Sequence, residues 1–248
     1  MNKRRRHART AKRGASKRKR KTPIAAAPKK SARGAKRSAK KTKPEIKTVI
    51  TLATKTQLRQ RLRAERRALS RDEQRQAADR LLANVAATRL FRVSRRIACY
   101  LPSDGEIDPS LIIERIWRMR KQAFLPVLSP LSHERLWFAR ATPGMELRPN
   151  RFGIPEPRTS AGELVRAEEL DLILLPLVAF DRKGNRLGRG AGFYDRSLAF
   201  LRYRRYFRKP HLLGLAHDFQ RVPSVSNDAW DVPLDGVVTD RAVYYMTS

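Results

Sequence analysis

An apolar strand signal, a glycine-rich loop and a helix signal follow one another over residues 171–195, and this order constrains the fold more than any other feature. Residues 172–175 form a continuous apolar run, as expected for a strand buried on both faces of a parallel sheet. Four glycines between positions 184 and 192 allow the backbone to approach a ligand closely. Arg186 and Arg189 add charged donors. Together these residues indicate a phosphate site.

The helix expected after this loop strengthens the indication. Free N–H groups at a helix start attract anions, and Asp195 in the first turn is suited to hold a cation against phosphates. The glycine spacing matches neither the dinucleotide-binding fingerprint nor the Walker A pattern. From the loop alone, a flexible surface turn with charged residues therefore stays open as an alternative.

The first 47 residues have a different composition from the rest. They hold 21 of the 56 Lys and Arg residues and a single acid, Glu45, with almost no large apolar side chains. Burial in such a segment cannot offset the entropy of ordering it. We therefore expect residues 1–48 to be a disordered basic tail and residues 49–248 to form one α/β domain.

Three interpretations of the tail remain open. Its charge would attract nucleic acid or another polyanion through counterion release, although no element that reads bases accompanies it. Scarce acids with Arg, Ser and Ala also fit an organelle transit peptide, but the dense lysine runs do not. Thirdly, the start could be mis-assigned. Because the next methionine is Met119, a start near Val49 would need a non-AUG codon.

Helix and strand signals alternate along the remaining residues. Ser70 with Glu73 three residues later forms a capping box that opens a helix toward position 87, after an earlier leucine-patterned helix. Asp108 and Pro109 are expected as the N-cap and first residue of a helix reaching position 120. The other expected elements are strands at 96–101, 123–127, 136–139, 172–175, 211–215 and 236–239 and a helix at 193–202. They predict a three-layer α/β fold, a mostly parallel sheet with helices on both faces.

Two further features bear on where the chain acts. No stretch approaches the roughly 20 apolar residues that span a bilayer. The single cysteine, Cys99, sits among apolar residues, which indicates a structural core position and a reducing compartment. We expect a cytoplasmic protein without a membrane partner.

Several segments resemble one known family. The string Leu-Gly-Arg-Gly-Ala-Gly-Phe-Tyr-Asp at 187–195, within residues 171–195, is similar to the signature of the 5-formyltetrahydrofolate cyclo-ligase family, also called methenyltetrahydrofolate synthetase. Other similar segments follow in the same order as in the family and cover about residues 52–242. They are Lys-Thr-Gln-Leu-Arg at 55–59 with Arg66 and Arg67, 97–102 with the acidic loop 104–108, 152–157, and 230–235 with 237–239.

The resemblance implies ATP-dependent conversion of 5-formyltetrahydrofolate to 5,10-methenyltetrahydrofolate, with release of ADP and phosphate. It also implies that ATP and Mg²⁺ meet the folate at the carboxyl edge of the sheet, where the acidic loop and the glycine loop are expected to converge. Phosphoryl transfer onto the formyl oxygen needs positioning and charge neutralisation more than a covalent side chain.

Site residues carry over by position. Arg189 and Asp195 are the expected catalytic residues, and Asp195 and Asp231 the expected metal ligands. Leu101, Glu106, Arg189 and Phe193 are expected to contact the folate. The expected nucleotide contacts are Lys55, Arg59, Arg186, Leu187, Gly188, Arg189, Gly190, Ala191, Gly192, Phe193 and Tyr194. Phe193 stands where some members carry Tyr, and Trp230 precedes Asp231 where many have His.

A second class of function competes with the enzyme. The chain could be a nucleic-acid-associated binding protein that acts through residues 1–47, with the domain as a scaffold. Binding by a peptide of the tail alone, without ATP turnover on 5-formyltetrahydrofolate, would distinguish it from the enzyme.

Overall fold

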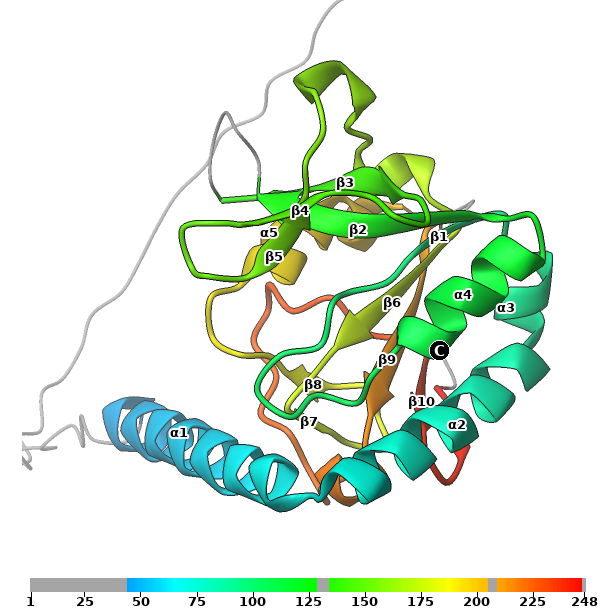
Figure 1. Cartoon of the computed structure of the whole chain (residues 1–248). Helices are drawn as coiled ribbons and strands as arrows, with labels where there is room; N and C mark the ends of the chain where they lie inside the picture. Colours follow the sequence, from blue (N-terminus) through cyan, green and yellow to red (C-terminus); the bar gives the residue numbers. More distant parts are fainter. Residues whose placement is uncertain (1–43, 129–133, 205–208, 247–248) are drawn as a thin grey trace, which may run out of the picture. The chain divides into compact units, whose positions relative to one another are not determined.

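The domain is built on a seven-stranded sheet (Figure 1). The computed structural model describes residues 44–128, 134–204 and 209–246, with side chains from Thr54 onwards. All of them belong to the second of two units, Thr42–Ser248, into which the chain divides. The strand order is β11-β10-β9-β6-β1-β2-β3. Their bounds are β1 Arg96–Ala98, β2 Gln122–Leu128, β3 Leu136–Ala141, β6 Leu172–Pro176, β9 His211–Ala216, β10 Gly236–Thr239 and β11 Val243–Tyr245.

The five inner strands are parallel, and the edge strands β11 and β3 are antiparallel to their neighbours. Alternate strand residues point to opposite faces and feed two separate cores. One face packs on helices α2 (Arg71–Ala87), α3 (Arg89–Val93) and α4 (Ser110–Arg118). The other packs on α5 (Phe193–Leu198) and the 3₁₀ segments Ala167–Glu169 and Ala199–Tyr203. The three-layer, mostly parallel fold expected from the sequence is confirmed.

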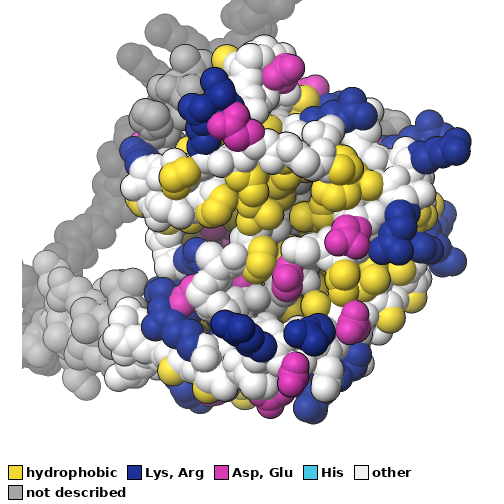
Figure 2. Space-filling model, in the orientation of Figure 1, with side chains coloured by type: hydrophobic (Ala, Val, Ile, Leu, Met, Phe, Trp, Pro, Cys, Tyr) yellow, Lys and Arg dark blue, Asp and Glu magenta, His cyan; other side chains and the backbone are white. Residues whose placement is uncertain are grey.

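Charges of both signs and hydrophobic side chains share the face seen in Figure 2, so this face is not uniformly basic. No helix in the described part of the chain combines the length and apolarity that crossing a membrane requires.

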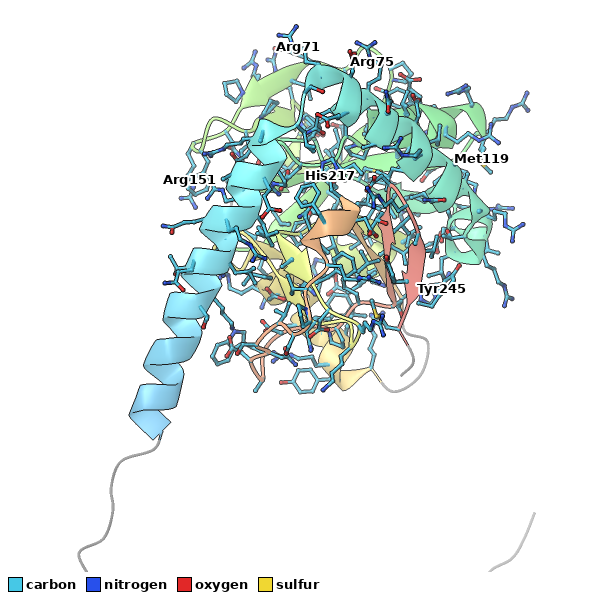
Figure 3. The ribbon with its side chains drawn as sticks, turned by 90° about the horizontal axis from the view of Figure 1, so that it is seen from below. Arg71, Arg75, Met119, Arg151, His217 and Tyr245 are labelled. Carbon is cyan, nitrogen blue, oxygen red and sulfur yellow. The ribbon has the colours of Figure 1, made fainter. Side chains whose placement is uncertain are left out.

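Helix α1 (Pro44–Ala68) meets α2 at a sharp corner, seen from below in Figure 3. The predicted capping box makes this corner: Ser70 Oγ accepts from the Glu73 N–H at 3.2 Å, and Glu73 Oε2 accepts from the Ser70 N–H at 2.8 Å. The helical backbone starts at Pro44, inside the segment expected to be tail, since a proline in the first turn leaves no helix hydrogen bond unmade. The rest of that expectation falls on residues 1–43, outside the described residues.

The β1–α4–β2 unit forms as predicted, but its helix starts one residue later than expected and ends at Arg118 rather than at position 120. The helix begins at Ser110 rather than Pro109, and Pro109 takes the cap position with φ −90° and ψ 8°. Asp108 still caps the turn, because its Oδ1 accepts from the Ser110 N–H at 2.8 Å. Strand β1 ends at Ala98, three residues before the predicted end.

The segment between β6 and α5 contains a hairpin that the sequence did not predict. Strands β7 (Ala179–Phe180) and β8 (Arg186–Leu187) pair antiparallel between β6 and the glycines. The helix expected at 193–202 stops at Leu198, whose φ of −104° and ψ of 2° leave the α region. The Ser197 hydroxyl donates to the Phe193 carbonyl and accepts from the Leu136 N–H, tying this short helix to β3.

The remaining elements are short. Strands β4 (Leu147–Pro149) and β5 (Pro155–Pro157) form a small ribbon, and further 3₁₀ turns span Ala161–Glu163 and Asp218–Gln220. Cys99 lies in the core at 1% exposure, and burial raises the pKa of its thiol. The structural role expected for it fits this position.

Candidate active site

The acidic loop after β1 and the glycine loop after β8 come together, as the sequence predicted. Strands β1 and β6 are parallel neighbours, with Ala98 opposite Ile173, so the loops that follow them leave the same edge of the sheet. Arg189 spans the two loops. Its Nε donates to Glu106 Oε1 at 2.9 Å, and its Nη2 donates to the Ser103 carbonyl at 3.0 Å and to the Ser103 hydroxyl.

Glu106 is a buried carboxylate held by charge. Its side chain is 4% exposed, and its second oxygen accepts from the Ser103 N–H at 3.2 Å. Burial raises the pKa of Glu106, while the positive charges of Arg189 and Arg66 oppose that rise. Such a carboxylate, with arginine on one side, can accept paired N–H groups from a flat heterocycle.

Helix α1 brings two cations from a distant part of the chain to the place where the acidic loop and the glycine loop meet. This place is called the mouth of the site below. Lys55 and Arg59 are one turn apart and therefore share a helix face. Lys55 Nζ lies 2.7 Å from Asp228 Oδ2, and Arg59 Nε donates to the Gly188 carbonyl at 2.9 Å. Both predicted nucleotide-binding cations thus border the glycine loop or the turn that carries Asp231.

The loop itself needs glycine at two points. Gly190 has φ +111° and faces the Arg59 guanidinium, and Gly192 has φ +66° immediately before α5. Gly188 is half-buried and Ala191 exposed, while Leu187 is buried at the end of the hairpin. The Arg59 side chain of α1 therefore lies directly against this loop.

Arg186 is placed differently from the other predicted nucleotide contacts. Its side chain is 5% exposed, its Nη2 lies 2.5 Å from Asp195 Oδ1, and its Nη1 donates to the Val232 carbonyl. Burial lowers the pKa of Arg186, and the charges of Asp195 and Asp231 oppose this. Arg186 thus ties the loop to Asp195 and Val232 from a buried position. Its predicted contact with a nucleotide remains a prediction.

The negative charges of both predicted metal ligands, Asp195 and Asp231, raise the pKa of the buried Arg186 guanidinium. One oxygen of Asp195 accepts from Arg186, and one oxygen of Asp231 accepts from the Asp228 N–H at 2.9 Å. Within the described ranges, no three His, Cys, Asp or Glu side chains gather to hold an ion. Two carboxylates suffice for an ion whose other ligands are phosphates and water, so these residues fit a nucleotide-bound Mg²⁺.

Of the other residues predicted to contact the folate, only Arg189 bonds Glu106. Leu101 is half-buried just after β1, and the Phe193 ring meets the exposed Phe152 ring edge to face at 6.0 Å. The Tyr194 phenol interacts with Glu106, and burial raises the pKa of that phenol.

Sequence reasoning assigned no individual role to three residues of this region, although Asp104 belongs to the predicted acidic loop. Asp228, which pairs with Lys55, stands three residues before Asp231, a spacing that could have signalled a carboxylate turn. Ser103 and Asp104 bond arginines from the glycine loop and from α1. Nothing in the local sequence distinguishes those arginines from solvated ones in so basic a chain.

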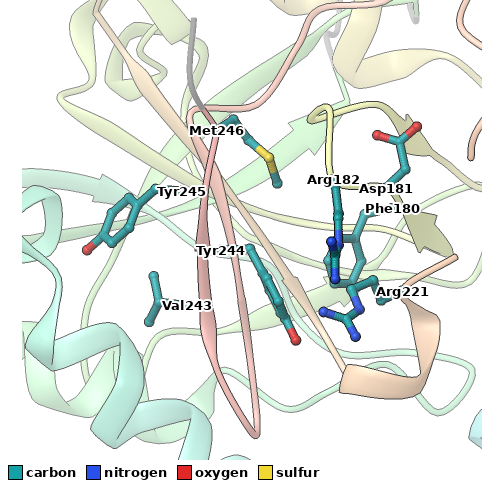
Figure 4. A pocket seen from close by; sticks show the side chains of 8 residues that line it. All are labelled: Phe180, Asp181, Arg182, Arg221, Val243, Tyr244, Tyr245 and Met246. Carbon is teal, nitrogen blue, oxygen red and sulfur yellow. The ribbon is translucent and has the colours of Figure 1, made fainter. Parts of the chain in front are cut away.

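A separate pocket of about 370 Å³ lies beside the β7–β8 hairpin and the edge strand β11. Figure 4 shows Arg182 and Arg221 near the Tyr244 ring there. Its lining is Phe180, Asp181, Arg182, Arg221, Val243, Tyr244, Tyr245 and Met246. No residue predicted for the active site lines it.

The comparison with known proteins decides the family. The model of the 5-formyltetrahydrofolate cyclo-ligase family matches residues 51–240. The chain belongs to the 5-formyltetrahydrofolate cyclo-ligase family. A cyclo-ligase of Escherichia coli K12 is 38% identical over 188 residues, which cover 74% of this chain and 98% of that protein. A mouse cyclo-ligase is 30% identical over 200 residues, covering 77% of this chain and 95% of the mouse protein.

Solved structures agree with this cyclo-ligase assignment. The 5,10-methenyltetrahydrofolate synthetase of Aquifex aeolicus superposes with a TM-score of 0.65 at 32% identity, covering 78% of this chain and 93% of that one. The synthetase of Mycoplasma pneumoniae gives a TM-score of 0.58 at 26% identity, covering 75% and 98%. These two synthetases therefore share their fold with about three quarters of this chain.

Proposed function

We propose that this cyclo-ligase closes the ring of 5-formyltetrahydrofolate with ATP at the junction of the acidic and glycine loops. The observation that supports this most is Arg189, which joins the loop expected to hold the nucleotide to the carboxylate expected to hold the folate. One side chain at that junction can face both substrates. ATP as co-substrate follows from membership of the family.

The reaction needs an activated formyl group. The formyl oxygen attacks the γ-phosphorus of ATP, the bond to the β,γ-bridging oxygen breaks, and ADP leaves. N10 then attacks the formyl carbon and loses its proton, and the carbon–oxygen bond breaks as phosphate departs. Negative charge is spread over the phosphoryl oxygens in the first step, so fixed positive groups accelerate it.

Each cation of the mouth then has a task. Lys55 and Arg59 neutralise the phosphates from α1, and the loop N–H groups from Gly188 to Gly192 hold them in place. Arg189 donates to the transferred phosphoryl group. Because its side chain is 37% exposed and lies on an open loop, it can exchange its contacts with Ser103 and Glu106 for phosphate.

Asp195 and Asp231 would hold Mg²⁺ against the phosphates. The ion, when bound, neutralises phosphate charge that these side chains cannot. Asp195 would share its carboxylate with Arg186, using the oxygen that takes no hydrogen bond from the described residues. Its position in the first turn of α5 keeps it next to the loop.

The folate would sit between Glu106 and the aromatic side of the mouth. Glu106 accepts N–H groups of the pterin, because a carboxylate can take two parallel hydrogen bonds. Leu101 and Phe193 supply apolar contact on either side of it.

No observation on the described residues favours the nucleic-acid-binding alternative. The face in Figure 2 mixes charges of both signs, and the basic residues 1–43 lie outside the described chain. Removing residues 1–41 is expected to leave ring closure intact. Loss of ring closure in that shortened chain would contradict this assignment of the activity to the domain.

The test is an absorbance assay with 5-formyltetrahydrofolate and ATP. The full chain should produce the near-ultraviolet absorbance of methenyltetrahydrofolate only when ATP is present. At a limiting Mg²⁺ concentration Asp195→Asn should form this product much more slowly than wild type, and the folded state of that variant is checked by circular dichroism. No product from the wild-type chain would reject the function, and full activity of Asp195→Asn would reject this part of the site.

A further inference from the structure

Arg66 is a fully buried arginine beneath the folate side of the mouth. It lies near the C-terminal end of α1 with a side-chain exposure of 0%. Its Nη2 is 3.3 Å from Asp104 Oδ2, and its Nη1 is 3.9 Å from Glu106 Oε1. Because no part of this side chain reaches the surface, it cannot itself touch a substrate.

Asp104 alone does not account for the burial of Arg66. The same carboxylate pairs with two more accessible arginines of α1: Arg63 at 2.6 Å and Arg67. Burying the Arg66 guanidinium as a third partner of Asp104 costs desolvation free energy. Attraction to a further negative group is needed to offset that cost. The remaining negative group beside Arg66 is Glu106, which makes Arg66 the member of the arginine trio that faces the site.

The loop between these groups is fixed to the helix corner. Gly105 has φ +71°, and a Cβ at this position would lie 2.9 Å from the Arg66 carbonyl oxygen. Gln74 of α2 donates to the carbonyls of both Arg66 and Gly105, at 3.4 and 3.3 Å. The distance from Arg66 to Glu106 is therefore set by backbone packing rather than by a mobile side chain.

Glu106 has two cationic neighbours of opposite character. Arg189 bonds it directly but lies on an open loop, and the proposed reaction requires Arg189 to attend to the phosphoryl group. A buried carboxylate left with no positive partner would take up a proton and lose one of its two acceptor sites. Arg66 cannot leave, because it is enclosed on all sides.

We infer that Arg66 is a positioning residue that keeps Glu106 ionised and aimed at the folate while Arg189 engages ATP. The inference rests on the proposed role of Glu106 as the folate carboxylate. The Nε and Nη1 atoms of Arg66 donate no hydrogen bond within the described residues, as expected for a guanidinium that acts by charge rather than by a bonded network.

The groups that face Glu106 define the expected pH behaviour. Arg66 faces it from α1 and Arg189 from the glycine loop, and the phenols of Tyr100 and Tyr194 interact with it from beyond β1 and from α5. Removing Arg66 takes away a positive charge that lowers the pKa of Glu106. Protonation then begins at a higher pH, so folate binding should weaken earlier on acidification.

The experiment compares Arg66→Met with the matched control Arg67→Met, in the full-length chain. Both positions are on α1 and pair with Asp104, but Arg66 alone of the two is near Glu106. Arg66→Met should raise the KM for 5-formyltetrahydrofolate about 10-fold or more, with kcat and the KM for ATP little changed. In a plot of kcat/KM for 5-formyltetrahydrofolate against pH, the acidic limb of Arg66→Met should move to higher pH. Arg67→Met should leave all four quantities near wild type.

A double-mutant cycle with Glu106→Gln separates this inference from the proposed function. If Arg66 acts through Glu106, Arg66→Met should add little to the KM of Glu106→Gln. An unchanged folate KM in Glu106→Gln would reject the folate role of Glu106 itself. A Glu106→Gln effect with equal Arg66→Met effects in both backgrounds would reject the coupling alone.

Arg66→Lys covers the case in which Arg66→Met does not fold. Lysine keeps the charge but supplies a single compact ammonium instead of the planar fork. Its folate KM should lie between wild type and Glu106→Gln, with the acidic limb close to wild type. Arg66→Lys and Arg67→Lys with identical folate KM values and pH profiles would overturn the inference.

Discussion

Arg186 and Arg189 stand three residues apart in one loop, yet the structure gives them opposite surroundings. Arg186 belongs to β8 and is enclosed, bonded to Asp195 and the Val232 carbonyl. Arg189 lies two residues after Leu187, where the hairpin ends, and reaches across to Glu106 and Ser103. Because the hairpin ends between them, Arg186 is a buried structural residue and Arg189 is an accessible residue of the site. Residue type alone does not separate these roles.

The largest effect should come from removing the exposed member. Arg189→Met is expected to lower kcat for ring closure by about 100-fold to 1,000-fold, because a donor aimed at developing charge is lost. Its free energy of unfolding should fall by less than that of Arg186→Met, because Arg189 is partly exposed and Glu106 still has Arg66 beside it. Urea denaturation and the absorbance assay measure the two quantities. A large loss of stability would erase the contrast with Arg186.

Removing the buried member should act mainly on stability. Arg186→Met leaves Asp195 without its cation and the Val232 carbonyl without its donor, so unfolding should become easier by about 3 kcal/mol. Denaturant melts of the two variants side by side measure this difference. Equal stability of Arg186→Met and Arg189→Met would show that burial does not separate the two arginines.

Asp195 and Asp231, the two predicted metal ligands, extend the comparison between Arg186 and Arg189. Asp195→Asn and Asp231→Asn should each raise the Mg²⁺ concentration needed for half-maximal activity, by about 10-fold if either residue is a ligand. Only Asp195 bonds Arg186, so only its variant should also lose stability. Mg²⁺ titrations at saturating ATP test this. Unchanged titration curves in both variants would remove these residues from the metal site.

A smaller effect is expected at the opposite end of the sheet, where Asp171 precedes β6. Burial opposes ionisation there, but hydrogen bonds from Lys209 and from the Arg96 and Arg95 N–H groups lower the pKa of Asp171 to about 2. A lowered pKa contributes stability above the unfolded value, near 4, and that contribution is lost as pH falls toward 2.

Asp171→Asn should therefore cost about 1 kcal/mol at neutral pH and little near pH 2, without changing ring closure. Melts across this pH range check the sign. A constant loss at every pH, or a fall in kcat, would contradict a purely structural role at this end.

The sequence carried the features that depend on local pattern. Ser70 and Glu73 defined a helix start, and the strand–helix–strand order implied parallel pairing of β1 and β2. From that order, convergence of the Glu106 and Arg189 loops followed. The β7–β8 hairpin was not predicted, because two-residue strands leave too short a pattern to detect.

The burial of Arg66 was not predicted, for a different reason. Arg63, Arg66 and Arg67 belong to one basic helix, and only the packing of the Asp104–Glu106 loop against that helix encloses the middle one. Such packing depends on contacts about 40 residues apart in the chain. The partner of Lys55, Asp228, lies 173 residues away and escaped for the same reason.

The central claim is that Arg189 joins ATP and the folate in one reaction. The most direct measurement follows ADP and methenyltetrahydrofolate together, in the wild-type chain and in Arg189→Met. The wild-type chain should release one ADP for each methenyl group formed and no product without ATP, and Arg189→Met should lose both products in parallel. Product formation without ATP, or full ring closure by folded Arg189→Met, would contradict the account.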